Sequence, residues 1–220
     1  MTRSFRTISI TADAVAFLAS ALAYPFLPER VATHFDDAGR PDRYGSRAAA
    51  ALTLPAIMAA LAAFGARLAM WPGRRDREDR ESGARALHEA VSFVQLGLLS
   101  GHLAALANGL GLRFNMSRVL RGIYGVLMIS LGNVIPKLPR NGLVGIRTPW
   151  TLADPTVWER THRLAGYLIT AAGVVDLLSL PVKGKRAARL PTATLLGAIG
   201  ASSVYSLIAY ARRDRTRRNS

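Results

Sequence analysis

The side chains best suited to binding lie in one irregular segment, residues 132–162, where Arg, Trp, Thr and His alternate with prolines and glycines. At its centre stands Arg147, whose planar guanidinium can hold a carboxylate, a phosphate or several carbonyl oxygens at once. A loop at a membrane edge has such carbonyls of its own to satisfy. Arg147 therefore either fixes its own loop or binds a ligand. The same two alternatives apply to Asn133 and Asn141. The candidate binding residues here are Asn133, Lys137, Asn141, Arg147, Thr148, Trp150, Thr151, Trp158 and His162.

A histidine ends this segment just after a predicted helix start. Asp154 and Pro155 form the start signal, with Asp as N-terminal cap and Pro at the first helical position. His162 follows Trp158 by four positions and so lies on the same face of that helix. With Glu159 as a partner, His162 could bind a ligand or carry a proton. The alternative is a histidine that hydrogen-bonds a carbonyl oxygen of the loop.

A second polar segment, residues 27–47, carries oxygen and nitrogen groups that could bind a divalent cation. These candidates are His34, Asp36, Asp37 and Asp42. Their spacing matches no established calcium loop. A turn stabilised by Asp side chains and shaped by Gly39 and Pro41 is the alternative, and no metal is predicted.

Ionisable residues also fall inside apolar runs. His88, Gln95 and His102 recur every seven residues and therefore share one helix face, while Asp176 lies deep in another run. Such groups are costly in a membrane and usually face the interior of the helix bundle. If Asp176 meets His102 or Arg67, the pair could carry protons or bind a cation; otherwise these groups fix helix packing.

Nothing in the sequence favours catalysis. We find no nucleophile, base and acid set, no phosphate-binding loop and no zinc spacing. The chain has no cysteine, which removes thiol chemistry and disulfides. We therefore predict neither an enzyme nor a cofactor.

The elements that must position these residues are apolar helices. Half of the 220 residues are hydrophobic, and apolar runs of about 18 residues or more predict membrane-spanning helices. Six such runs predict an all-α, polytopic integral membrane protein with two long ordered loops. The runs are residues 8–27, 48–71, 86–112, 119–135, 164–182 and 190–211.

The charge lies between these runs. The chain has 29 Lys and Arg against 14 Asp and Glu, a net charge of +15, and we attribute it to loops at the bilayer surface and not to direct nucleic-acid binding. Because cytoplasmic loops collect Lys and Arg, the distribution favours both termini in the cytoplasm. The basic loop "VKGKRAAR" does not fit that arrangement. The first run also resembles a secretory signal, but Asp13 interrupts it and a retained helix is the simpler interpretation.

The segment "GNVIPKLPRNGLVGIRTPWTLADPTVWERTHRLAG" resembles the signature of the SdpI family of bacterial membrane proteins. The stretch "YPFLPERVATHFDDAGRPDRYGSR" looks like a short N-terminal domain of unknown function often found ahead of it. The signature positions that match are Gly132, Asn133, Pro136, Lys137, Asn141, Gly145, Ile146, Arg147, Thr148, Pro149, Trp150, Thr151, Trp158, Thr161, His162 and Gly166.

The resemblance implies an immunity protein of the bacterial cytoplasmic membrane. Such a protein would bind a secreted peptide toxin, relay its presence to a cytoplasmic transcriptional repressor, or do both. The competing hypothesis is a small proton- or cation-coupled transporter that uses Asp176 and His102. We expect an N-terminal two-helix unit (residues 1–71), a charged cytoplasmic linker (72–85) and a four-helix unit with the signature (86–220).

Overall fold

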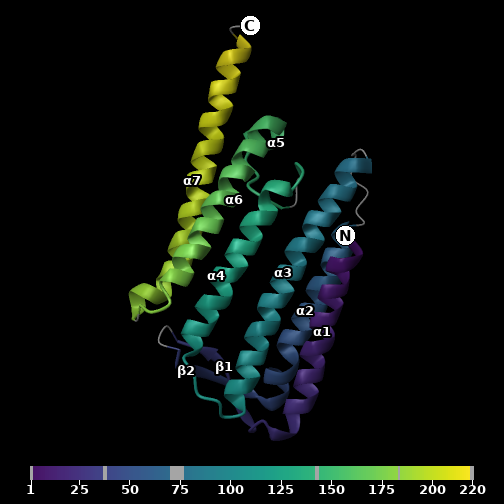
Figure 1. Ribbon diagram of the computed structural model, residues 1–220, viewed down its shortest axis with the longest axis vertical. Helices are drawn as coiled ribbons and strands as arrows, with labels where there is room; N and C mark the ends of the chain where they lie inside the picture. The colour runs from purple at the N-terminus through teal and green to yellow at the C-terminus, as the bar shows by residue number, and fades with distance from the viewer. Residues whose placement is uncertain (1, 37–38, 70–76, 142–143, 183, 219–220) are drawn as a thin grey trace.

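The computed structural model describes residues 2–36, 39–69, 77–141, 144–182 and 184–218 (Figure 1). Long helices run nearly parallel to one another, and a small hairpin closes one end of the bundle. The elements are α1 (Thr2–Ala23), the 3-10 helix η1 (Tyr24–Phe26), β1 (Arg30–Phe35), β2 (Pro41–Ser46), α2 (Arg47–Ala69), α3 (Arg77–Gly109), α4 (Met116–Val134), the 3-10 helix η2 (Ile135–Lys137), α5 (Pro149–Ala153), α6 (Pro155–Leu178) and α7 (Lys185–Arg218).

Five helices in the described part of the chain are long and apolar enough to cross a membrane. Their spans are Phe5–Phe26, Arg47–Arg67, Gly83–Gly109, Met116–Lys137 and Arg186–Asp214. The remaining predicted run, 164–182, falls in α6, which has 24 residues but includes Asp176 and a polar start. At 1.5 Å per residue α6 is about 36 Å long, and it packs against α4 and α7. The protein is an all-α polytopic membrane protein, as predicted.

The helices form two groups of three. The helices α1, α2 and α3 pack together, as do α4, α6 and α7, and α3 joins the groups by packing against α4. In Figure 1 both termini point toward one end of the bundle, and the β1–β2 hairpin lies at the other. The signature segment spans the end of α4 and the start of α6, so it lies at the end toward which the termini point.

Two parts of the first half differ from expectation. The predicted loop 27–47 contains an antiparallel hairpin whose register shifts on either side of His34. Its strands were missed because β1 does not alternate: adjacent Val31 and Ala32 are both buried. Of the predicted linker 72–85, residues 72–76 lie outside the described residues. Residues 77–85 belong to α3.

The hairpin is anchored by its first strand. Val31 joins Leu27 in a buried cluster with Ala23, Ala51 and Leu106, so α1, α2 and α3 meet there. At the turn, Gly39 has a positive φ of 79° and faces the backbone nitrogen of Ser117 at the start of α4. The hairpin therefore contacts both helix groups.

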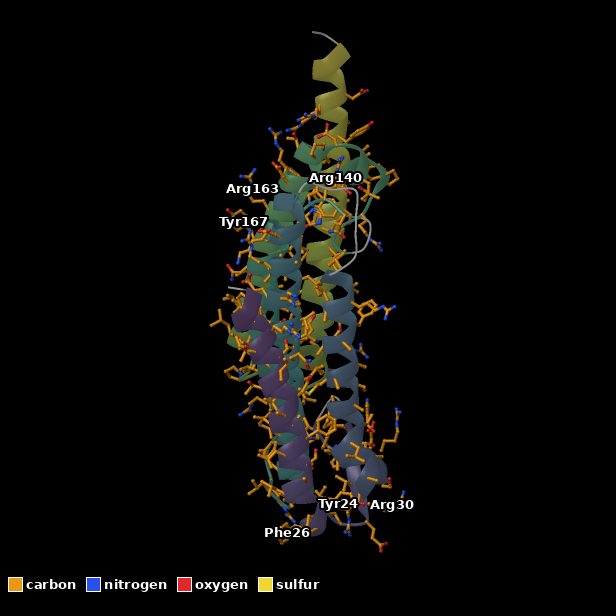
Figure 2. All side chains as sticks on the ribbon, turned by 90° about the vertical axis from the view of Figure 1, so that its right-hand side faces the viewer. Tyr24, Phe26, Arg30, Arg140, Arg163 and Tyr167 are labelled. Atoms are coloured by element: carbon orange, nitrogen blue, oxygen red, sulfur yellow. The ribbon has the colours of Figure 1, made fainter. Side chains whose placement is uncertain are left out.

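Exposed aromatic residues lie toward both ends of the helix bundle. Figure 2 shows Tyr24, Phe26 and Arg30 at the hairpin end, and Arg140, Arg163 and Tyr167 toward the other. Phe26 and Tyr167 are 76% and 68% exposed. Aromatic rings beside basic side chains suit the interface between hydrocarbon and water.

Glycines bring α4 and α6 into backbone contact. A methyl group on Gly132 would lie 2.8 Å from the carbonyl oxygen of Gly166, and one on Gly166 would lie 2.6 Å from that of Gly132. Seven residues away on each helix, Gly125 of α4 and Gly173 of α6 contact each other in the same way. Small residues give this close approach between helices in membranes, where lipid provides no hydrophobic driving force between them.

We predict that Gly132→Ala lowers the free energy of unfolding by about 1–3 kcal/mol, because the added methyl group forces α4 away from α6. The matched control is Gly197→Ala in α7, where nothing lies within 4 Å of the added methyl group. That change should be neutral or stabilise by up to about 1 kcal/mol, since Ala favours helix over Gly. Equilibrium unfolding in detergent measures both. Equal effects of the two substitutions would contradict the packing argument.

Candidate functional site

The signature loop, residues 138–154, leaves η2 at the end of α4 and returns through α5 to the start of α6. Pro136 ends α4 in a short 3-10 turn. Asp154 starts α6 as predicted: its Oδ1 accepts hydrogen bonds from the backbone nitrogens of Thr156 and Val157, at 2.8 and 3.2 Å. The loop therefore has fixed ends on two helices that touch through their glycines.

A buried Trp–His pair holds the middle of the loop. Trp158 and His162 are 2% and 0% exposed, and their rings stack with centroids 3.9 Å apart. The indole Nε1 of Trp158 donates to the carbonyl oxygen of Leu138 at 2.9 Å. One side chain of α6 thereby fixes the first residue of the loop.

Both ring nitrogens of His162 are used. Nδ1 donates to the carbonyl oxygen of Trp158 at 2.8 Å, so Nε2 carries the lone pair and accepts from the backbone nitrogen of Ile146 at 3.0 Å. These bonds require the neutral ring. Burial lowers the pKa of His162 from 6.5, and its bond to the Trp158 backbone opposes that shift. Here His162 receives a hydrogen bond from the loop, whereas the sequence-based alternative had it bonding a loop carbonyl.

Gly145 allows the loop to reach His162. Its φ is +116°, a conformation that disfavours any residue with a side chain. A methyl group at Gly145 would also collide with the Nε2 atom of His162. Backbone conformation and space both require glycine at this position.

The short helix α5 carries the two signature threonines. Thr148 and Thr151 form a reciprocal capping box, and the hydroxyl of Thr151 also donates to the carbonyl oxygen of Ile146 at 2.8 Å. Trp150 contacts α7: its Nε1 donates to Ser206 Oγ at 2.5 Å. This helix thus links the signature loop to the last helix of the chain.

Charged groups fix the loop to α3 and α7. Lys137 pairs with Glu89 of α3 at 2.9 Å, and Arg213 of α7 pairs with the Oδ2 atom of Asp154 at 2.6 Å. Arg140 donates to the carbonyl oxygens of Leu152 and Ala153, at 3.1 and 3.3 Å. The loop is therefore tied to both helix groups.

Asn133, Asn141 and Arg147 have different surroundings. The Nδ2 atom of Asn133 donates to Ile129 of its own helix at 3.0 Å. Asn141 closes its own turn, because its Oδ1 accepts from the backbone nitrogen of Val144 at 2.7 Å and its Nδ2 donates to the Val144 carbonyl at 3.0 Å. Arg147 is exposed on the surface of the loop.

The first-loop candidates lie on the hairpin at the opposite end of the bundle. The His34 Nδ1 and Asp42 Oδ1 atoms are 2.6 Å apart across the two strands. Asp36 accepts from the backbone nitrogen and the Nε of Arg40, at 2.8 and 3.0 Å. Asp37 lies outside the described residues. Among the described residues no group of three or more side chains could hold a metal ion, and Asp36 stabilises the turn.

The two intramembrane candidates lie in different helix groups. His102 of α3 contacts Ser20 of α1, with Nε2 and Oγ 2.8 Å apart. Asp176 of α6 accepts from Thr194 of α7, whose Oγ1 lies 3.3 and 3.4 Å from its two oxygens. The packing partners of His102 and Asp176 thus come from separate groups.

Three partners of the signature could not be predicted from the sequence: Glu89, Ser206 and Arg213. Ser206 and Arg213 lie more than 50 residues beyond the residues they bind, and Glu89 lies 48 residues before Lys137. Serine on an apolar helix and arginine in a basic run are both common. Only the fold brings them to the loop.

We predict that acid loosens the loop at Ile146. The pKa of His162 is lowered in the folded protein, so the unfolded chain binds a proton more readily and stability is lost as pH falls below 6.5. As pH falls, hydrogen exchange of the Ile146 amide should therefore accelerate more in the wild-type protein than in the His162→Gln variant. Glutamine keeps a hydrogen-bond acceptor but does not titrate. Amide protection that changes with pH identically in both proteins would contradict this assignment.

Comparison with known proteins agrees with this geometry. Residues 137–210 match the SdpI/YfhL protein family, and residues 14–59 match a domain of unknown function, DUF1648. The Immunity protein SdpI of Bacillus subtilis (strain 168) is 26% identical over 168 residues, which are 76% of this chain and 77% of that protein. No solved structure matches the chain. The predicted resemblance is confirmed: residues 137–210 are similar to the SdpI/YfhL protein family, and residues 14–59 ahead of them are similar to DUF1648.

Proposed function

We propose that this membrane protein confers immunity to a secreted antimicrobial peptide and acts by binding, not by catalysis. The observation that carries the proposal is the folded signature loop, which presents the exposed Arg147 on a frame attached to α3, α6 and α7. The similarity to an immunity protein over three quarters of the chain supports it. An arginine on the surface of such a loop suits recognition of carboxylate or carbonyl groups.

The proposal includes a direction across the membrane. The end that carries the signature loop faces the cytoplasm, and the hairpin end faces outside, where a secreted peptide arrives. Exposed arginines at the loop end support this orientation because basic residues collect on the cytoplasmic side. They include Arg140, Arg147, Arg160, Arg163 and Arg212.

A relay to a cytoplasmic transcriptional repressor is consistent with the contacts of the loop. The hairpin touches the start of α4 at Gly39, and α4 leads directly into the signature loop. Lys137 and Arg213 tie that loop to α3 and α7. A peptide that moves the hairpin end relative to these helices would therefore change the surface around Arg147.

Transport is the competing function, and it would use Asp176 and His102. The separate surroundings of these residues, Thr194 for Asp176 and Ser20 for His102, favour packing roles over a shared proton path. Each polar group satisfies a helix neighbour within its own group. The immunity proposal depends on neither residue.

We predict that Arg147→Ala reduces protection about tenfold or more, because it removes the charged group that the loop offers to a partner on the cytoplasmic side, and one charged hydrogen bond contributes about 1.5–3 kcal/mol. The test expresses each variant in a sensitive bacterium and measures killing by a panel of purified secreted peptides. Arg160→Ala, which removes another exposed arginine of the same end, is the matched control and should protect fully. Asp176→Asn should also protect.

Two outcomes would oppose the proposal. The first is a wild-type chain that protects against no peptide although it reaches the membrane. The second is protection that Asp176→Asn abolishes and Arg147→Ala leaves intact, which would favour transport.

Topology can be tested separately. The connection between α6 and α7, around Gly184, lies at the hairpin end of the bundle. We predict that a reporter fused after Lys185 reports the outside of the cell and that one at the C-terminus reports the cytoplasm. A cytoplasmic signal after Lys185 would contradict the orientation, despite the basic residues of that connection.

A further inference from the structure

One face of α6 carries a continuous stripe of side chains that changes from basic to aromatic to apolar along the helix. With 3.6 residues per turn, the six positions of this stripe fall within about 80° of one another around the helix axis. All six are exposed, and Tyr167, Val174 and Leu178 are 68%, 42% and 75% exposed. The stripe consists of Arg160, Arg163, Tyr167, Ala171, Val174 and Leu178.

The two arginines of the stripe make no contact that would use their charge within the protein. Neither the Arg160 nor the Arg163 guanidinium has a hydrogen bond or an ion pair with the described part of the chain. Other arginines of this end differ, because Arg140 donates to two carbonyl oxygens and Arg213 pairs with Asp154. The stripe therefore offers two positive charges to a partner outside the chain.

The order of the side chains along α6 matches the layers of one half of a bilayer. From Tyr167 to Leu178 the helix rises about 16 Å, close to half of a hydrocarbon core of about 30 Å. Tyrosine favours the boundary between this core and the headgroups, and Arg163 lies one turn before Tyr167. Figure 2 shows these two side chains next to each other at the side of the bundle, toward the end that carries Arg140. The polar start of α6 then lies at headgroup depth.

We propose that this stripe binds an anionic phospholipid: Arg160 and Arg163 hold the phosphate of the headgroup, and an acyl chain lies along the rest of the stripe. A guanidinium can give a phosphate two parallel N–H groups. In a zwitterionic lipid the positive group beside the phosphate opposes the arginines, so the site selects a headgroup with a net negative charge. The immunity proposal does not depend on this site, and the site functions in either orientation of the protein.

The apolar part of the stripe distinguishes a lipid from a soluble acidic partner. An acidic protein could reach the two arginines, but it could not follow the stripe to Leu178 at the depth of the hydrocarbon. A phospholipid carries its negative charge and its apolar chain in the same order as the stripe. Anionic headgroups also attract basic side chains at the membrane surface, which places the lipid where the apolar contact can form.

Tryptophan fluorescence with brominated lipids tests the site in the full chain, reconstituted in vesicles of phosphatidylcholine and phosphatidylglycerol. Ala171→Trp places a reporter on the stripe. Leu18→Trp places one on the exposed side of α1, where Leu18 is 60% exposed and the sequence has no basic residue from Thr7 to Glu29. The fluorescence of the protein without a reporter is subtracted. Because the bromine atoms lie on the acyl chains, quenching reports the lipid itself and not a free phosphate.

The reporter on the stripe should prefer the anionic lipid. At residue 171 phosphatidylglycerol should associate about fivefold or more strongly than phosphatidylcholine, since each basic side chain near an anionic headgroup adds attraction. At residue 18 neither lipid should be preferred. Arg160→Gln combined with Arg163→Gln should remove the preference at residue 171. These side chains are exposed, so the variant should fold, and circular dichroism checks that it does.

The matched control removes two exposed arginines from the hairpin end. Arg30→Gln combined with Arg43→Gln should leave the preference at residue 171 unchanged. Equal preference at residues 171 and 18 would overturn the proposal, because the net charge of the whole protein would then attract the lipid. A preference that persists in the Arg160→Gln, Arg163→Gln variant would also refute it, and so would no preference at residue 171.

Discussion

At Gly132 the backbone of α4 comes so close to Gly166 of α6 that a methyl group on either residue would meet the carbonyl oxygen of the other. The signature loop lies between these two glycines in the sequence: it begins at Leu138, six residues after Gly132, and ends at Asp154, twelve residues before Gly166. Their contact fixes the distance that the loop must bridge. The bond from Trp158 to Leu138 and the bond from Ile146 to His162 both join the loop to α6 across that distance.

Both helix groups bury polar atoms, and in neither group of the described chain do all of them have hydrogen-bond partners. Around the signature loop both nitrogens of His162 have partners, and Asp154 receives two backbone N–H groups and a guanidinium. In the first group Asp13 and Gln95 retain acceptors without donors. Polar groups that hold one another as they do around the loop give rigidity, and His162 and Asp154 therefore fix the two ends of the loop's contact with α6.

Local signals predicted much of this structure. Apolar runs located the crossing helices, and Asp154 with Pro155 marked the start of α6 because capping acts between neighbouring residues. The hairpin escaped prediction because its short strands bury two consecutive residues and have an irregular register. Arg213, Ser206 and Glu89 escaped because their contacts span some fifty residues or more of sequence.

Two contacts join the signature to a helix that is translated later. They are the bond between Trp150 and Ser206 and the ion pair between Asp154 and Arg213. Chains emerge from the ribosome from the N-terminus onward, so the signature is translated well before its partners in the last helix. Until that helix inserts, the indole nitrogen of Trp150 and one oxygen of Asp154 have no α7 partner. Insertion of the final helix is therefore the step that completes the loop, and a nascent chain that stops short of Ser206 carries the signature without its finished structure.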